Sequence, residues 1–237
     1  MRVRAVLAAA LSSFVLTSAA PARAEDPARE ERPRGHALGI GEPRAPEPFT
    51  LEQRYLEAAR RGDRATIERA LELGADVQAR DDLARSALLL AAKEAGSLEL
   101  VELLHAKGVP LDEPDVGGRT ALSFAASEGY ITIARWLAEH GAQIDRRDRE
   151  GRTPLFHAVG GDRRDVVAWL LDRGADPNAA DQFRDTPLML ACVQGRSEIA
   201  ALLLQRGADP TLRNQEGRSA ADRAAPGADV CRTPAAS

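Results

Sequence analysis

The sequence predicts an all-α solenoid in which pairs of short helices stack side by side, and three observations support this fold class. Two markers, a Gly-Ala or Gly-Val pair and a Thr or Ser, recur together with spacings of 34, 33, 33 and 33 residues. The markers fall at Gly74, Gly108, Gly141, Gly174 and Gly207, and at Ser86, Thr120, Thr153, Thr186 and Ser219. Between them, apolar residues recur at i, i+1, i+4 and i+5, which is a helical pattern. Such a period predicts stacked repeats that bury one continuous core.

Residues 1–24 have the layout of a secretory signal peptide. Arg2 and Arg4 give a basic start, residues 5–20 carry no charge, and Ala22 and Ala24 are small residues where signal peptidase cleaves. A retained N-terminal anchor is the alternative, but the uncharged run is short and rich in Ala and Ser for a membrane-spanning helix. We therefore expect cleavage after Ala24, no stable membrane insertion afterwards, and a periplasmic or secreted protein.

Residues 25–49 are predicted to form a disordered linker. The segment holds five prolines and mixed charges, with very few large apolar residues. It cannot bury enough apolar surface to offset the conformational entropy of ordering the chain. We expect no chemistry of its own in this segment.

The helical elements then follow in order from residue 50 to residue 225. An N-terminal cap at 50–80 precedes four full repeats at 81–114, 115–147, 148–180 and 181–213, and a truncated C-terminal cap at 214–225. In each repeat the Thr or Ser marker is expected to cap the first helix, with Pro154 and Pro187 at the first helical position. The glycine marker should end the second helix. The single extra residue lies in the run Lys93–Ala95, and residues 226–237 are expected to form a flexible tail.

The first helices carry a recognisable motif. Residues 153–158 read Thr-Pro-Leu-Phe-His-Ala and residues 186–191 read Thr-Pro-Leu-Met-Leu-Ala. These segments resemble the T-P-L-H-x-A motif of ankyrin repeats, and the resemblance covers about residues 51–225. The histidine of the motif is replaced in this chain by Leu89, Ser123, Phe156 and Met189. The resemblance implies an ankyrin-repeat solenoid with β-hairpin-like loops, whose concave groove binds another protein.

An arginine column is the first candidate for partner binding. The residue before each Thr or Ser cap is Arg85, Arg119, Arg152, Asp185 or Arg218, and Arg184 lies in the adjacent turn. Guanidinium groups pair well with carboxylates, so these arginines could bind an acidic partner. The alternative is ordinary turn chemistry, in which Asp81, Asp115, Asp148 and Asp181 neutralise the arginines within the protein.

Further candidates lie at the loop tips and on the first helices. The tip residues align as Leu83, Gly117, Glu150, Phe183 and Glu216, and among them Phe183 is an aromatic that could anchor a partner. Alternatively, Phe183 folds back on its own loop. Helical spacing places Phe124, His157, Leu190 and Val193 toward the groove. Gly160 and Gly161 either open a shallow hollow beside His157 or mark a frayed helix end.

The two cysteines leave two interpretations open. Cys192 replaces a small buried residue of the last full repeat, and Cys231 lies in the predicted tail. In an oxidising compartment they could form a disulfide that holds the tail over the unfinished end of the stack. Otherwise Cys192 is an inert buried thiol and Cys231 is an exposed one.

Composition and motifs exclude several other classes of function. A formal charge of −4 gives no basic face for nucleic acid, and only 4% of residues are aromatic. We find no nucleophile motif, phosphate-binding loop or Cys/His spacing for a metal, so we expect no enzyme activity, no cofactor and no metal. The chain should be a monomer that binds an unidentified protein.

The sequence therefore favours a non-catalytic protein-binding module of the bacterial cell envelope. Lys93 and Lys107 are the only lysines beside many arginines, a composition typical of GC-rich bacterial genomes. Two alternatives remain: a structural accessory or chaperone-like stabiliser of an envelope enzyme, and a secreted effector that acts on a host protein. Fold-level similarity gives the class of function and does not name the partner.

Overall fold

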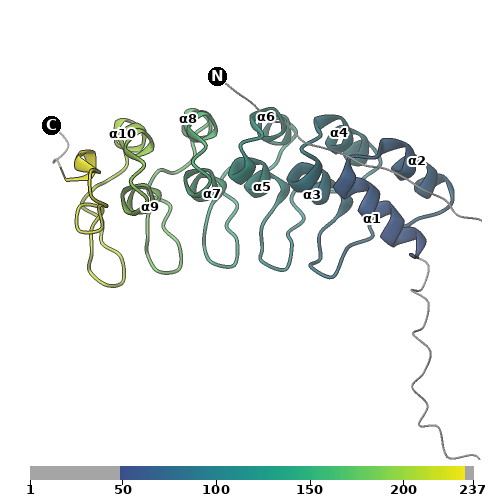
Figure 1. The fold of residues 1–237 in the computed structure, drawn as a ribbon, viewed down its shortest axis with the longest axis horizontal. Helices are drawn as coiled ribbons and strands as arrows, with labels where there is room; N and C mark the ends of the chain where they lie inside the picture. Colours follow the sequence, from purple (N-terminus) through teal and green to yellow (C-terminus); the bar gives the residue numbers. More distant parts are fainter. Residues whose placement is uncertain (1–48, 233–237) are drawn as a thin grey trace, which may run out of the picture. The chain divides into compact units, whose positions relative to one another are not determined.

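The computed structural model describes residues 49–232, and these form one row of helix pairs (Figure 1). The predicted signal peptide and residues 25–48 of the predicted linker lie outside the described residues. The α-helices are α1 (Leu51–Arg61), α2 (Arg64–Glu72), α3 (Ala87–Leu90), α4 (Leu98–Ala106), α5 (Ala121–Glu128), α6 (Ile131–Glu139), α7 (Pro154–Gly160), α8 (Arg164–Asp172), α9 (Pro187–Val193) and α10 (Ser197–Gln205). No strand is formed within residues 49–232, so the all-α solenoid is confirmed.

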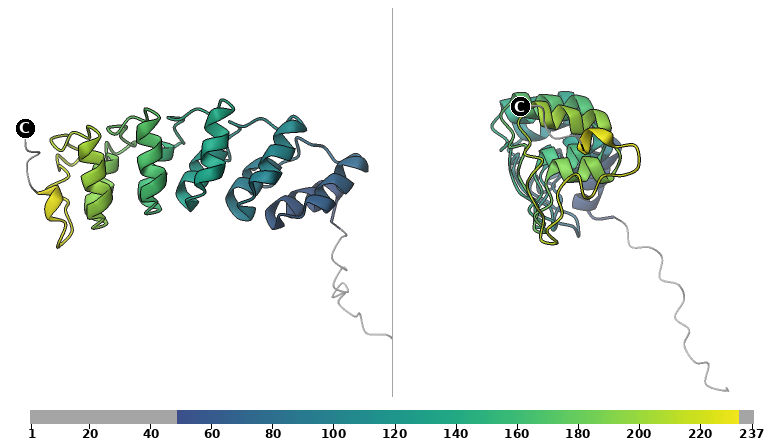
Figure 2. Two further views of the ribbon diagram at one scale, coloured as in Figure 1. Left: turned by 90° about the horizontal axis from the view of Figure 1, so that it is seen from above. Right: turned by 90° about the vertical axis from the view of Figure 1, so that its left-hand side faces the viewer.

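The odd-numbered helices form one layer and the even-numbered helices form a second layer above it (Figure 1). Seen from above, the pairs lie side by side along the row (Figure 2). Consecutive first helices pack on one another, as α5 does on α7 and α7 does on α9. Long loops leave the row on the side of the first helices, and this arrangement places the loops and the first helices on a common surface.

Local chemistry explains where each first helix begins. The hydroxyl groups of Ser86, Thr120, Thr153 and Thr186 each accept a hydrogen bond from the backbone N–H three residues later. Pro154 and Pro187 occupy the first helical turn, where a missing N–H costs nothing. The predicted caps are therefore confirmed.

The extra residue of the first full repeat is accommodated by a π-helical turn. Helix α3 continues directly into η1 (Ala91–Ala95), whose wider turn holds one more residue than an α-helical turn. Gly96 then ends the helix with φ at +59°. The insertion therefore lies where the spacing of the markers places it, and it leaves the period of the following repeats unchanged.

The core is a continuous layer of small and branched apolar side chains that runs through all helix pairs. Alanines of the first helices and of η1, such as Ala91, Ala125 and Ala158, are fully buried and allow close approach of neighbouring repeats. Leucines such as Leu104 and Leu137 fill the space below the second helices. None of the helices within residues 49–232 is long and apolar enough to cross a membrane.

The C-terminal end of the stack is closed without an α-helix. After α10 the described chain forms turns and a short 3₁₀ helix, η2 (Asp229–Cys231), which packs against α10. Ala228 and Cys231 are buried, and a disulfide joins Cys231 to Cys192 of α9. The prediction of a flexible tail from residue 226 is therefore wrong for residues 226–232, because a buried apolar contact and a covalent bond hold them on the last repeat.

Candidate protein-binding face

Five loops, here called fingers 1 to 5, join the helix pairs and begin the truncated last unit. They comprise residues 73–86, 107–120, 140–153, 173–186 and 206–219. Each tip is organised by one side chain, whose Oδ1 accepts the backbone N–H groups two and four residues later. These side chains are Asp81, Asp115, Asp148, Asp181 and Asn214. Since one acceptor holds two donors at each tip, the fingers are locally ordered rather than loose loops.

Backbone hydrogen bonds also connect each finger to the next. The N–H of Val116 donates to the carbonyl of Leu83 at 2.9 Å, and the same contact recurs between Arg149 and Gly117 at 2.9 Å. It recurs again from Gln182 to Glu150 at 2.7 Å and from Gln215 to Phe183 at 3.0 Å. We call the surface made by the finger tips and the exposed sides of the first helices the finger face.

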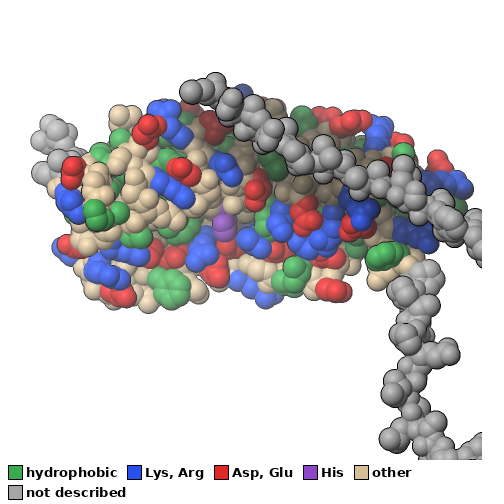
Figure 3. All heavy atoms as spheres, viewed as in Figure 1, with side chains coloured by type: hydrophobic (Ala, Val, Ile, Leu, Met, Phe, Trp, Pro, Cys, Tyr) green, Lys and Arg blue, Asp and Glu red, His purple; other side chains and the backbone are tan. Residues whose placement is uncertain are grey.

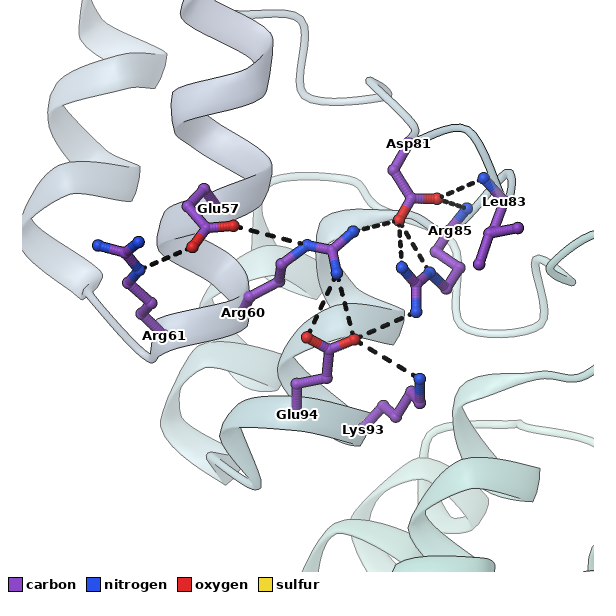
Figure 4. A network of polar contacts seen from close by, with 8 residues as sticks. All are labelled: Glu57, Arg60, Arg61, Asp81, Leu83, Arg85, Lys93 and Glu94. Atoms are coloured by element: carbon purple, nitrogen blue, oxygen red, sulfur yellow. Dashed lines mark hydrogen bonds and ion pairs between the residues drawn. The ribbon is translucent and has the colours of Figure 1, made fainter. Parts of the chain in front are cut away.

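The arginine column does not form one exposed basic surface. Arg85 is only 7% exposed, and its guanidinium pairs with Asp81 and with Glu94 of η1 (Figure 4). Arg60 of α1 pairs with the same two carboxylates. The prediction that Arg85 contacts a partner is therefore wrong, since this residue joins the N-terminal cap to the first full repeat.

The other arginines of the column are more exposed but are paired within the protein. Arg152 pairs with Glu150 at 2.6 Å, and Arg218 pairs with Glu216 two residues before it. Asp185, which interrupts the column, pairs with Arg223. The tip glutamates therefore neutralise Arg152 and Arg218, and Nε of Arg152 also lies 3.9 Å from Oδ2 of Asp181.

Arg119 also changes the prediction for Phe124. The guanidinium lies over the Phe124 ring at 4.3 Å from its centroid, and Lys93 lies over the same ring at 5.3 Å. Phe124 is consequently only 3% exposed, and its prediction as an exposed apolar contact is wrong. Helical spacing placed the ring on the correct side of α5, but two cations cover it.

His157 is half-buried and its ring is bound within the protein. Its Nε2 lies 2.9 Å from Oδ2 of Asp148, whose carboxylate is almost fully buried. Burial would raise the pKa of Asp148, but hydrogen bonds from His157 and from the backbone N–H groups of Arg152 and Glu150 outweigh burial and lower it. His157 therefore supports finger 3 from below and presents only a small part of its ring to solvent.

Gly161 does not open the hollow predicted for it and for Gly160. A Cβ atom on Gly161 would lie 2.1 Å from the carbonyl oxygen of Ser127, so this glycine permits close packing of α7 on the end of α5. Gly160 is exposed at the end of α7, where a Cβ atom would have only Leu190 within 4 Å. Gly161 serves packing, and its prediction as part of a partner pocket is wrong, whereas partner binding at Gly160 stays a prediction.

A hollow beside His157 does exist, between fingers 2 and 3, where sequence reasoning did not place it. It measures about 470 Å³ and is lined by Gly117, Arg119, Asp148, Arg149, Glu150, Arg152 and His157. Arg149 is exposed and makes no ion pair within residues 49–232. The feature of the sequence that could have indicated this hollow is Gly117 at the tip of finger 2, because fingers 3 and 5 carry glutamate at the same position.

Besides Arg218, four predicted residues toward the C-terminal end of the finger face remain exposed enough to contact a partner. Phe183 is 51% exposed and Val193 is 39% exposed, whereas Leu190 is half-buried. Arg184 is exposed and has φ at +62°, a strained conformation for a residue with a side chain. Over this face Lys and Arg side chains are interspersed with Asp and Glu (Figure 3).

Stacked helix pairs with ordered fingers on one side define a class of repeat proteins that bind other macromolecules through a modular surface. Within residues 49–232, no group of three or more His, Cys, Asp or Glu residues could hold a metal ion. A family model described as ankyrin repeats (3 copies) matches residues 56–148, 111–181 and 145–214. The chain belongs to the ankyrin repeat family, whose repeats are non-catalytic modules that generally mediate protein–protein interaction. Comparison with curated proteins finds no match to this chain.

Proposed function

We propose that this protein is a non-catalytic binding module that acts outside the cytoplasm, in the bacterial cell envelope or as a secreted protein, and binds a partner protein on its finger face. The single observation that carries this proposal is Phe183. A large aromatic side chain at the tip of finger 4 is 51% exposed, although its backbone is held on both sides. Its N–H donates to Asp181 and its carbonyl accepts from Gln215.

An exposed aromatic ring on an ordered backbone is well suited to anchor a partner. The ring adds apolar contact area, and the loop loses little conformational entropy when it binds because it is already ordered. Val193 and Leu190 of α9 provide further apolar surface on the first helix that follows finger 4. Charged side chains around them can select the partner and its orientation.

The test of partner binding compares two exposed apolar residues. The wild-type chain, Phe183→Asp and Leu73→Asp are immobilised and exposed to an envelope extract. Leu73 is the matched control, because it is 57% exposed but lies at the end of α2, away from the finger tips. We expect wild type and Leu73→Asp to retain one stoichiometric protein, and Phe183→Asp to retain about tenfold less. Equal losses in both variants would contradict the proposal.

Two features support the proposed location. The first 24 residues have the layout of a secretory signal, and the Cys192–Cys231 disulfide is of a kind that persists in oxidising compartments. Cell fractionation followed by N-terminal sequencing tests this location. We expect protein in the envelope or medium that begins at Glu25, whereas a cytoplasmic chain that retains Arg2 and Arg4 would overturn it.

A further inference from the structure

The hollow between fingers 2 and 3 differs from the rest of the finger face in its charge. In fingers 3 and 5, the arginine before the Thr or Ser marker pairs with a glutamate two residues earlier: Arg152 with Glu150, and Arg218 with Glu216. The equivalent residue in finger 2 is Gly117, so Arg119 lacks this tip carboxylate. Its remaining partner, Asp115, also accepts the backbone N–H groups of Gly117 and Arg119.

The missing side chain also leaves space beside the arginine. A Cβ atom on Gly117 would lie 3.1 Å from Oδ1 of Asp115 and 3.6 Å from Nε of Arg119, so a side chain at this position would begin beside both the carboxylate and the guanidinium group. Arg119 itself is held in place because it stacks on Phe124, and its side chain is 41% exposed. The hollow therefore presents an ordered cation with an empty position next to it.

Arg149 provides a second cation in the same hollow. It follows Asp148 at the tip of finger 3, is exposed, and makes no ion pair among the described residues. The Nε of Arg152 on the same wall is buried without a hydrogen-bond partner. The acids of this wall are already engaged, since Asp148 binds His157 and backbone N–H groups and Glu150 binds Arg152.

We infer that this hollow binds a carboxylate side chain from an acidic segment of the partner protein, which occupies the place of the missing tip glutamate between Arg119 and Arg149. The inference rests on the proposed function and specifies the chemistry of the partner. Charge-assisted hydrogen bonds between guanidinium and carboxylate groups are among the strongest polar contacts in proteins. The pairs in fingers 3 and 5 show the geometry that the partner's carboxylate would reproduce.

Gly117→Glu supplies that carboxylate from within the chain and is the sharpest test. Glutamate already occupies this position in fingers 3 and 5, where the tip makes the same hydrogen bonds, and Gly117 does not need a positive φ. The finger should therefore tolerate the change after a shift of a few tenths of an ångström at Asp115, which would lie 3.1 Å from the new Cβ atom. Arg149→Gln removes the second cation. Arg135→Gln on the exposed side of α6 is the control, and each of the three variants lowers the net charge by one.

The probe is a fluorescein-labelled hexaglutamate peptide, and its binding to the full chain is measured by fluorescence anisotropy at low ionic strength. We expect wild type to bind it about tenfold more tightly than labelled hexaglutamine. Gly117→Glu and Arg149→Gln should each weaken binding by about tenfold, and Arg135→Gln by less than about twofold. Circular dichroism of each variant shows whether the helices are intact, and Arg149→Gln carries the test if Gly117→Glu does not fold.

Two results would overturn the inference. Equal weakening by all three variants would mean that the peptide is attracted by overall charge, and the absence of any preference for hexaglutamate would mean that the hollow does not bind carboxylates. The proposed function is tested separately. If Phe183→Asp loses the captured protein while Gly117→Glu retains it, the binding module stands and the acidic-segment inference fails.

Discussion

At the scale of single residues, the side chain that organises each finger tip is the most informative feature, and it is an aspartate in fingers 1 to 4 and Asn214 in finger 5. Asp148 illustrates its two tasks, because one oxygen accepts two backbone N–H groups and the other binds His157. Asn214 at the equivalent position of finger 5 accepts the same two backbone N–H groups, and its Nδ2 donates to Asp185 instead of pairing with a histidine. Comparison of the two fingers therefore separates two contributions to stability, one from the hydrogen bonds of the turn and one from the charge of the side chain.

This separation predicts different costs for two substitutions of Asp148. Asp148→Asn keeps an acceptor for the turn and should lower the free energy of unfolding by about 1 kcal/mol, whereas Asp148→Ala leaves buried donors unpaired and should cost about 2–3 kcal/mol. Urea unfolding measures both. Equal costs for the two variants would contradict the proposed division between turn geometry and charge.

The lowered pKa of Asp148 also sets the pH dependence of this difference. A carboxyl group whose pKa is lower in the folded protein contributes stability above about pH 4, its value in the unfolded chain, and that contribution is lost as the pH falls through the folded value. The gap in stability between wild type and Asp148→Asn should therefore narrow in acid. If the difference in stability between the two proteins widened below about pH 4, the predicted direction of the pH dependence would be wrong.

At the scale of helices and loops, periodicity predicts the elements well and the exposed surface poorly. The two markers, the caps and the inserted residue are local signals, and each is found where the sequence places it. Exposure depends on which long side chain covers which ring. Arg119 and Lys93 cover Phe124, and no spacing rule foresees that arrangement. The prediction for Gly161 is wrong because it too depends on a contact between repeats: its close neighbour, Ser127, belongs to the preceding repeat.

The π-helical turn η1 helps to join the N-terminal cap to the first full repeat. Glu94 lies in this turn and pairs with Arg60 of the N-terminal cap and with buried Arg85 (Figure 4). Glu94→Gln should lower the free energy of unfolding by about 1–2 kcal/mol, because Asp81 alone then faces both guanidinium groups. Thermal or urea unfolding provides the measurement.

Glu68→Gln is the matched control for Glu94→Gln. Glu68 pairs with Arg64 within α2, and both side chains are more than two-fifths exposed. Exposed pairs of this kind contribute little, so the change should stay below about 0.5 kcal/mol. Similar effects of the two substitutions would show that the network between the cap and the first repeat adds nothing beyond a surface ion pair.

At the scale of the whole molecule, the disulfide stabilises the last unit, which forms no α-helix among the described residues. It joins residues 39 positions apart and holds the segment after residue 219 against α9 and α10. In the chain-entropy model a loop of this length contributes roughly 4 kcal/mol. Cys231→Ala should therefore lower the free energy of unfolding by about 2–4 kcal/mol.

Hydrogen exchange locates this effect along the chain. In Cys231→Ala, amide protection should fall first in residues 219–232 and next in α10, and should change least in α1 and α2, because each repeat contacts only its neighbours. Wild type treated with a reductant should behave in the same way. Uniform loss of protection along the row would instead indicate that the molecule unfolds as one cooperative unit.

The backbone hydrogen bonds that connect successive finger tips have a consequence for the rate of recognition. They fix the separation between Leu83, Phe183 and the positions between them before any encounter occurs. A ligand that matches this fixed spacing can dock without waiting for the protein to rearrange, so its capture should be limited by diffusion and orientation. A ligand whose contact groups are spaced differently cannot be accommodated by movement of the fingers. The fixed spacing therefore selects among partner proteins by the distance between their contact groups.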